Sequence, residues 1–306
     1  MASETTRIEV LDQYRSISKK LKRTFFKKPN ENEALESYVD LAREWENLEL
    51  PAYAGLSWHA AAKCENALGN SVGEITNLLR SARSYAKEEL NNLQTGCVSQ
   101  GWDTVQASLS SYLSAISKYK KDSPQAVALN LEVANFLQMI GKGDSAGNFL
   151  NSALEHCVNG ELLKIHCLNL LATNSIKTGD YVAALESFTE MHNILQTLPN
   201  NGEKAQLHME CEINRVLLLL ILKPPLQKLT SDLTQVLERY TWGDKNDESI
   251  KDCLMSEYVF ILLESLVTTC QSADTSCLND LEMKLWPLLN KNQRDLLRIL
   301  VQIYYP

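Results

Sequence analysis

The stretch that decides the fold runs from Leu168 to Leu195 and reads LNLLATNSIKTGDYVAALESFTEMHNIL. Apolar residues recur in it at three- and four-residue spacing, which predicts two helices. Gly179 stands between the two halves, and a glycine permits the tight reversal that joins antiparallel helices. The residues expected to pack where the helices cross are Leu171, Ala172, Ala184, Leu185 and Phe188. This order is typical of a tetratricopeptide hairpin.

An earlier stretch repeats this order at an offset of 38 residues. Gly141 takes the place of the later glycine, between a first and a second apolar segment. The corresponding packing residues are Val133, Ala134, Ala146, Leu150 and Ala153. An offset of 38 residues is close to the period of about 34 residues in tetratricopeptide repeats. The two copies therefore predict a superhelical stack of antiparallel helical hairpins.

Composition indicates the same fold class for the whole chain. The 306 residues are 44% apolar, enough for a sizeable core, and include only 12 Gly and 8 Pro. Strand-like alternation is absent over long stretches, so we predict an all-α protein. Further helices are expected over Ala34–Leu48, Pro51–Ala62, Asp232–Tyr240, Ser249–Thr269, Ser276–Leu289 and Gln293–Ile303. The first two of these segments are expected to pair.

The chain is expected to form one helical-repeat domain over residues 1–306, because no Gly/Ser/Pro-rich linker divides it. The clearest loop is the short segment 199–203, which separates the better-patterned repeats from more divergent C-terminal helices. The longest apolar run, Val216 to Leu222, is far too short to span a bilayer and is expected to be buried. The first residues, MASETTRIEV, show no secretory signal, so a soluble intracellular protein is expected.

The first 28 residues form a basic segment on an acidic chain. They carry a net charge of +5, whereas the remaining residues carry −13. Tyr14, Ile17, Leu21 and Phe25 recur at helical spacing, which predicts a basic amphipathic helix that ends before Pro29. The candidate partner-binding residues on this helix are Arg15, Lys19, Lys20, Lys22, Arg23, Lys27 and Lys28.

Three interpretations of the basic helix remain open at this point. Its apolar side could cap the first repeat while the charged side is solvated. Its charges could instead dock on an acidic protein surface. They could also contact anionic lipid, at about 1 kcal/mol per basic residue. Nucleic acid is not expected as a partner of an acidic chain without interleaved aromatics.

Catalytic and cofactor motifs are missing from the sequence. It contains no GxSxG elbow and no GxxxxGK[ST] loop, so neither a hydrolase nucleophile nor a nucleotide site is predicted. The histidine–cysteine pairs 156/157, 166/167 and 208/211 lack the four-ligand spacing of a structural zinc site. We expect no enzyme activity, no cofactor and no metal. The eight cysteines, which include no CxxC pair, are expected to be small buried apolar residues.

Three segments carry a resemblance to a known family. They are Tyr14–Asn30 (YRSISKKLKRTFFKKPN), Cys211–Trp242 (CEINRVLLLLILKPPLQKLTSDLTQVLERYTW) and Leu281–Leu289 (LEMKLWPLL). Their amino-acid sequences and their order resemble those of the huntingtin-associated protein family, also called the factor VIII intron-22 protein family. Because they lie at the start, the late middle and the end, the resemblance covers nearly the whole chain.

The resemblance implies a tetratricopeptide-like stack, similar in outline to soluble NSF attachment proteins, that binds huntingtin between that protein's helical-repeat domains. It also implies a link to early endosomes through a Rab-family GTPase, a part in vesicle movement, and a cytoplasmic location that extends to the nucleus. Family members carry a long Pro/Ala-rich insertion where this chain has only Pro199 to Glu203. A function of that insertion is therefore not expected here.

These observations lead to two functional hypotheses. The first is a non-enzymatic scaffold that binds and stabilises or recruits huntingtin. The second is a peripheral membrane adaptor of endosomes, in which the basic amphipathic helix lies on anionic lipid while the repeats hold cargo.

Overall fold

The computed structural model describes residues 4–21, 30–97, 102–158, 160–199, 202–225, 229–242, 255–272 and 275–304, with side chains from residue 11 onward. All regular structure in these ranges is helical, so the predicted all-α class is confirmed. The described residues form two compact units, Met1–Val158 (unit 1) and Asn159–Pro306 (unit 2). The single domain expected over residues 1–306 remains a prediction.

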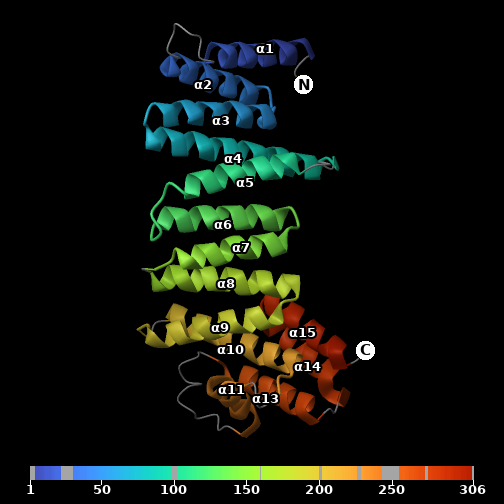
Figure 1. Cartoon of the computed structure of the whole chain (residues 1–306). Helices are drawn as coiled ribbons and strands as arrows, with labels where there is room; N and C mark the ends of the chain where they lie inside the picture. Colours follow the sequence, from blue (N-terminus) through green and yellow to red (C-terminus); the bar gives the residue numbers. More distant parts are fainter. Residues whose placement is uncertain are drawn as a thin grey trace. The chain divides into compact units, whose positions relative to one another are not determined.

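Unit 1 is a row of helices in which sequence neighbours lie side by side (Figure 1). Its helices are α1 (Glu4–Leu21), α2 (Glu31–Asn47), α3 (Pro51–Ala67), α4 (Ser71–Gln94), α5 (Asp103–Ile116), α6 (Pro124–Met139) and α7 (Gly143–Glu155). Because each connection is short, consecutive helices run antiparallel and form hairpins.

The α2–α3 hairpin shows why these residues pack as they do. Trp45 and Trp58 are both almost fully buried, and Ala42 and Ala54 leave room for the two indoles between the helices. Apolar residues at three- and four-residue spacing put these side chains on facing sides of the two helices. The pairing expected for the segments Ala34–Leu48 and Pro51–Ala62 is thus confirmed, with slightly different helix ends.

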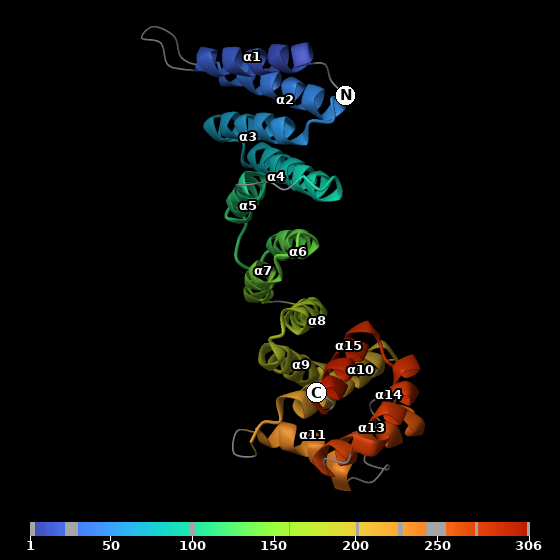
Figure 2. The same ribbon diagram turned by 90° about the vertical axis from the view of Figure 1, so that its right-hand side faces the viewer.

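Unit 2 begins with a hairpin and then folds back on itself (Figure 2). Its helices are α8 (Glu161–Thr178), α9 (Tyr181–Thr197), α10 (Gly202–Leu222), α11 (Ser231–Trp242), α13 (Glu257–Ser272), α14 (Leu278–Leu285) and α15 (Lys291–Tyr304), with 3-10 turns η2 (Thr275–Cys277) and η3 (Trp286–Leu288). The C-terminal α15 packs on α8 and α10, where Asn292 donates a hydrogen bond to Thr173 Oγ1 (2.9 Å).

The two glycines that predicted the repeat have the same backbone geometry. Gly141 ends α6 with φ +73°, and Gly179 ends α8 with φ +82°. In both turns the next residue donates a backbone hydrogen bond of 2.8 Å across the turn, from Lys142 to Leu137 and from Asp180 to Ser175. A residue with a Cβ would be strained at such a φ, so glycine is the residue that suits this helix end. Both predicted hairpins, α6–α7 and α8–α9, are therefore confirmed.

Two predicted helices differ from the structure. The segment Ser276–Leu289 is not one continuous α-helix, because 3-10 turns lie on either side of α14. The second turn, η3, contains Pro287, which cannot donate the amide hydrogen that a continuous α-helix needs. For Ser249–Thr269, the structure describes α13 from Glu257 to Ser272, and residues 249–254 lie outside the described ranges. Of the loop 199–203, residues 200 and 201 lie outside them as well. The apolar run that begins at Val216 is buried through Leu220, as predicted.

Candidate functional site

The basic helix α1 is the first candidate site, and its two faces are well separated. Tyr14, Ile17 and Leu21 pack against the cores of α2 and α3. The aromatic ring of Tyr14 lies 5.4 Å from that of Tyr38, and burial raises the pKa of the Tyr14 hydroxyl. The apolar face of α1 therefore covers the α2–α3 hairpin, as expected of a helix that caps the first repeat.

The charged face of α1 is turned to solvent. Arg15 forms an exposed ion pair with Asp12 (3.0 Å), and Lys19 and Lys20 are exposed. The remaining candidates, Lys22, Arg23, Lys27 and Lys28, lie outside the described residues. The structure thus presents three of the predicted cations on one helix, and their role in partner binding remains a prediction.

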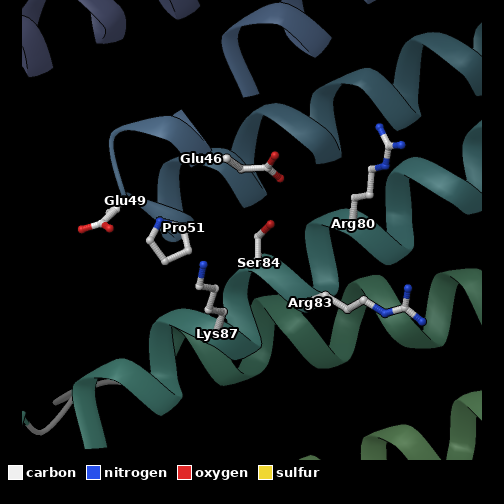
Figure 3. Close-up of a pocket in the computed structure, with 7 residues that line it drawn as sticks. All are labelled: Glu46, Glu49, Pro51, Arg80, Arg83, Ser84 and Lys87. Atoms are coloured by element: carbon white, nitrogen blue, oxygen red, sulfur yellow. The ribbon is translucent and has the colours of Figure 1, made fainter. Parts of the chain in front are cut away.

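A second candidate site is a pocket of 340 Å³ between α4 and the corner that joins α2 to α3 (Figure 3). One wall belongs to α4 and the opposite wall to the end of α2 and the start of α3. Its volume is at the lower end of the range of about 300–1,000 Å³ for ligand pockets. The lining residues are Glu46, Glu49, Pro51, Arg80, Arg83, Ser84 and Lys87.

Two cations of the α4 wall have different surroundings. Arg80 stacks on Trp58, with the guanidinium carbon 4.6 Å from the ring centroid, and Trp58 Nε1 donates to Glu46 Oε1 (2.7 Å). Arg83 points away along α4 and donates two hydrogen bonds, of 2.7 and 2.8 Å, to both carboxylate oxygens of Glu132 on α6. The indole thus supports Arg80 in the pocket, whereas Glu132 neutralises Arg83.

The carboxylate of Glu132 is shared by two donors. Tyr112 on α5 also donates a hydrogen bond to it (2.8 Å). Burial alone would raise the pKa of Glu132, but the hydrogen bonds from Arg83 and Tyr112 bring it below its ordinary value. The cations of the α4 wall occur at positions i, i+3 and i+7 and can be found from the sequence; they are Arg80, Arg83 and Lys87. No local sequence pattern indicates that Arg83 pairs with Glu132, which is 49 residues away.

Unit 2 contains a buried polar cluster that sequence reasoning did not find. Arg215 on α10 is completely buried and contacts Glu212 on the same helix (3.4 Å) and Asp232 on α11. Arg239 on α11 forms a further ion pair with Glu212. Burial is the largest influence on Glu212 and raises its pKa, against the two guanidiniums. Removing one member of such a cluster would leave an uncompensated buried charge and so destabilise the fold.

Two stacked histidines lie beside this cluster. The ring centroids of His192 on α9 and His208 on α10 are 4.6 Å apart, and the two rings are nearly parallel. His208 Nε2 lies 2.9 Å from His192 Nδ1. Burial is the main reason why the pKa of His192 is lowered to about 3, and Arg215, His208 and Arg239 add to the effect. His192 is therefore neutral at physiological pH.

The cysteines agree only in part with the prediction that they are buried. Five are buried, at positions 64, 157, 167, 211 and 270, but Cys97 and Cys277 are exposed, so the prediction is wrong for these two. Both lie at helix boundaries, where no apolar face covers them. Cys253 lies outside the described residues.

The residues that the structure describes hold neither a metal-binding cluster nor a membrane-spanning helix. No cluster of three or more histidine, cysteine, aspartate or glutamate side chains there is arranged to hold a metal ion. Within the same ranges, no helix combines the length and apolarity that crossing a bilayer requires. The polar side chains of the pocket and of the buried cluster make ion pairs and hydrogen bonds both within and between helices.

Stacked antiparallel hairpins with charged surfaces define this chain as an all-α helical-repeat protein. No protein-family model matches it. The 40-kDa huntingtin-associated proteins of mouse (Mus musculus) and rat (Rattus norvegicus) are each 30% identical to it over 354 aligned residues, covering 96% of this chain and 92% of each relative. The chain therefore belongs to the huntingtin-associated protein family, which confirms the resemblance seen in its sequence.

The alignment with these relatives is longer than the 306-residue chain itself, so the relatives carry residues that this chain lacks. The shortened loop expected at residues 199–203 remains a prediction. Since the match covers nearly all of both proteins, the helices on either side belong to the shared part of the family.

Proposed function

We propose that this protein is a non-enzymatic scaffold that binds the huntingtin of its own organism and stabilises or recruits it. The supporting observation is the similarity, over 96% of the chain, to relatives named as huntingtin-associated. A stack of helical hairpins suits this role, because repeat proteins offer extended surfaces to a large partner.

The proposal includes the absence of catalysis and of a bound cofactor. The sequence lacks nucleophile and phosphate-binding motifs. The buried charges of Glu212 and Arg215 are paired with one another. Following the resemblance, we also propose a cytoplasmic protein that reaches early endosomes through a Rab-family GTPase, acts in vesicle transport and has access to the nucleus.

Co-expression tests the central proposal. The chain and its own organism's huntingtin are produced together and applied to a size-exclusion column at low salt. We expect the two proteins to elute together in a fixed ratio, because large complementary surfaces give a stable complex. Separate elution of the two folded proteins would refute the proposal.

The alternative function is a peripheral membrane adaptor, which the cations Arg15, Lys19 and Lys20 on the exposed face of α1 favour. The apolar face of α1 speaks against insertion into lipid, because Tyr14 and Ile17 already pack on α2 and α3. Flotation with anionic vesicles distinguishes the two functions. Flotation of the chain without any protein partner would favour the adaptor, whereas chain remaining in the bottom fraction would exclude it.

A further inference from the structure

The pocket of unit 1 has walls of opposite charge. On the α4 wall, Arg80, Ser84 and Lys87 occur at positions i, i+4 and i+7. Figure 3 shows Ser84 and Lys87 pointing from α4 toward the α2–α3 corner, whereas Arg80 leaves α4 on the far side of Glu46 from that corner. On the opposite wall, Glu46 and Glu49 flank the start of α3. The pocket therefore favours an occupant that itself carries both signs of charge.

The charges that face this pocket are only partly neutralised within the protein. Among the residues that the structure describes, no carboxylate pairs with Arg80 or Lys87, and no cation pairs with Glu49. Arg83, in contrast, is already paired with Glu132. Two cations on one wall and one carboxylate on the other are thus available to a partner.

The positions of these charges constrain the occupant. Arg80 and Lys87 are seven residues apart on α4, so their Cα atoms are separated by about 10 Å along the helix axis. Between them lies Ser84, which is only 9% exposed and turns its hydroxyl to the pocket. A volume of 340 Å³ holds a few side chains and no complete helix.

We propose that this pocket docks a charged segment of the huntingtin partner that presents carboxylates to Arg80 and Lys87 and a basic side chain to Glu49. The inference rests on the proposed function, because it assigns a binding site to the partner proposed there. It places part of the interface on α4 and the α2–α3 corner, away from the basic helix α1.

Single charge reversals on the two walls test this site with little risk to the fold, because both side chains are exposed. Lys87→Glu is expected to lower the affinity for the huntingtin of the chain's own organism about threefold at low salt. Glu49→Lys is expected to lower it by a similar factor. The double variant Arg80→Gln/Lys87→Glu is expected to lose about tenfold. Circular dichroism of each variant confirms that the helices are retained.

Matched controls make the same change of net charge outside the pocket. They are Lys63→Glu on α3 and Glu36→Lys on α2, both at exposed positions of the same unit. Their affinities should stay within about twofold of the parent chain. High salt should reduce the differences among all variants, because it screens exposed charges.

Each outcome decides the inference. Weaker binding by both pocket variants, with unchanged controls, supports the two-signed site. Unchanged binding by Lys87→Glu overturns the site while leaving the proposed function intact. Tighter binding by Glu49→Lys indicates a uniformly acidic partner surface and also overturns it. If the parent chain itself does not bind huntingtin, the proposed function fails, and this inference fails with it.

Discussion

Lowering the pH from about 7.5 to about 5 is expected to reduce the free energy of unfolding by about 2 kcal/mol through His192 alone. Folding places this imidazole against His208, with Gln196 Nε2 2.9 Å from its second ring nitrogen. Arg215 and Arg239 are the cations whose charges act on it. Added positive charge is therefore opposed by burial and by two neighbouring guanidiniums.

The sign and size of the effect follow from the two pKa values. The pKa of His192 is about 3 in the folded protein and 6.5 for an unperturbed histidine. The unfolded chain thus binds a proton on this residue between these values while the folded chain does not, so stability is lost as the pH falls below about 6.5. Proton linkage lowers the free energy of unfolding by about 1 kcal/mol at pH 6 and by about 2 kcal/mol at pH 5.

Urea unfolding followed by circular dichroism at several pH values measures this loss. The variant His192→Asn removes the titrating ring and keeps a polar atom near the nitrogen that faces His208. Other groups, such as Glu212 with its raised pKa, contribute with the opposite sign, since their protonation favours the folded state. The informative quantity is therefore the difference between the pH profiles of the parent chain and the variant.

The matched control is His166→Asn, which changes an exposed histidine on α8 of the same unit. The control should keep the pH profile of the parent chain, whereas the profile of His192→Asn should be flatter by about 2 kcal/mol between pH 7.5 and 5. Parallel profiles for the parent chain and His192→Asn would refute the reasoning, because protonation of His192 would then have no effect on the free energy of unfolding.

Three further predictions concern single features of the structure. Asp180→Ala removes the side-chain cap of α9 and should cost about 1 kcal/mol in urea unfolding; a loss near zero would contradict it. Arg215→Met leaves the buried carboxylate of Glu212 with one guanidinium and should cost about 3 kcal/mol, and a cost under about 1 would show that water reaches the cluster. The double variant Lys19→Glu/Lys20→Glu should weaken huntingtin binding a few-fold at low salt. Unchanged affinity would mean that α1 only covers the first repeat and does not contact the partner.

Local signals in the sequence were enough for the class of fold and for several of its details. Gly141 and Gly179 predicted two helix ends, because the backbone conformation at such an end depends only on neighbouring residues. The pairing of α2 with α3 was likewise predictable from helical periodicity around Trp45 and Trp58. The family, too, was recognisable from sequence segments alone.

The sequence alone thus determined both the stack of helical hairpins and the membership of the huntingtin-associated family. Helical periodicity, turn residues and sequence similarity to a family are all properties of contiguous segments. Only the tertiary structure decided which charges are paired and which face a pocket. Arg83 meets Glu132 from 49 residues away, and Arg215 is buried in a helix whose pattern predicts an apolar face. Such contacts depend on how helices pack, and electrostatic energies change steeply with burial and distance.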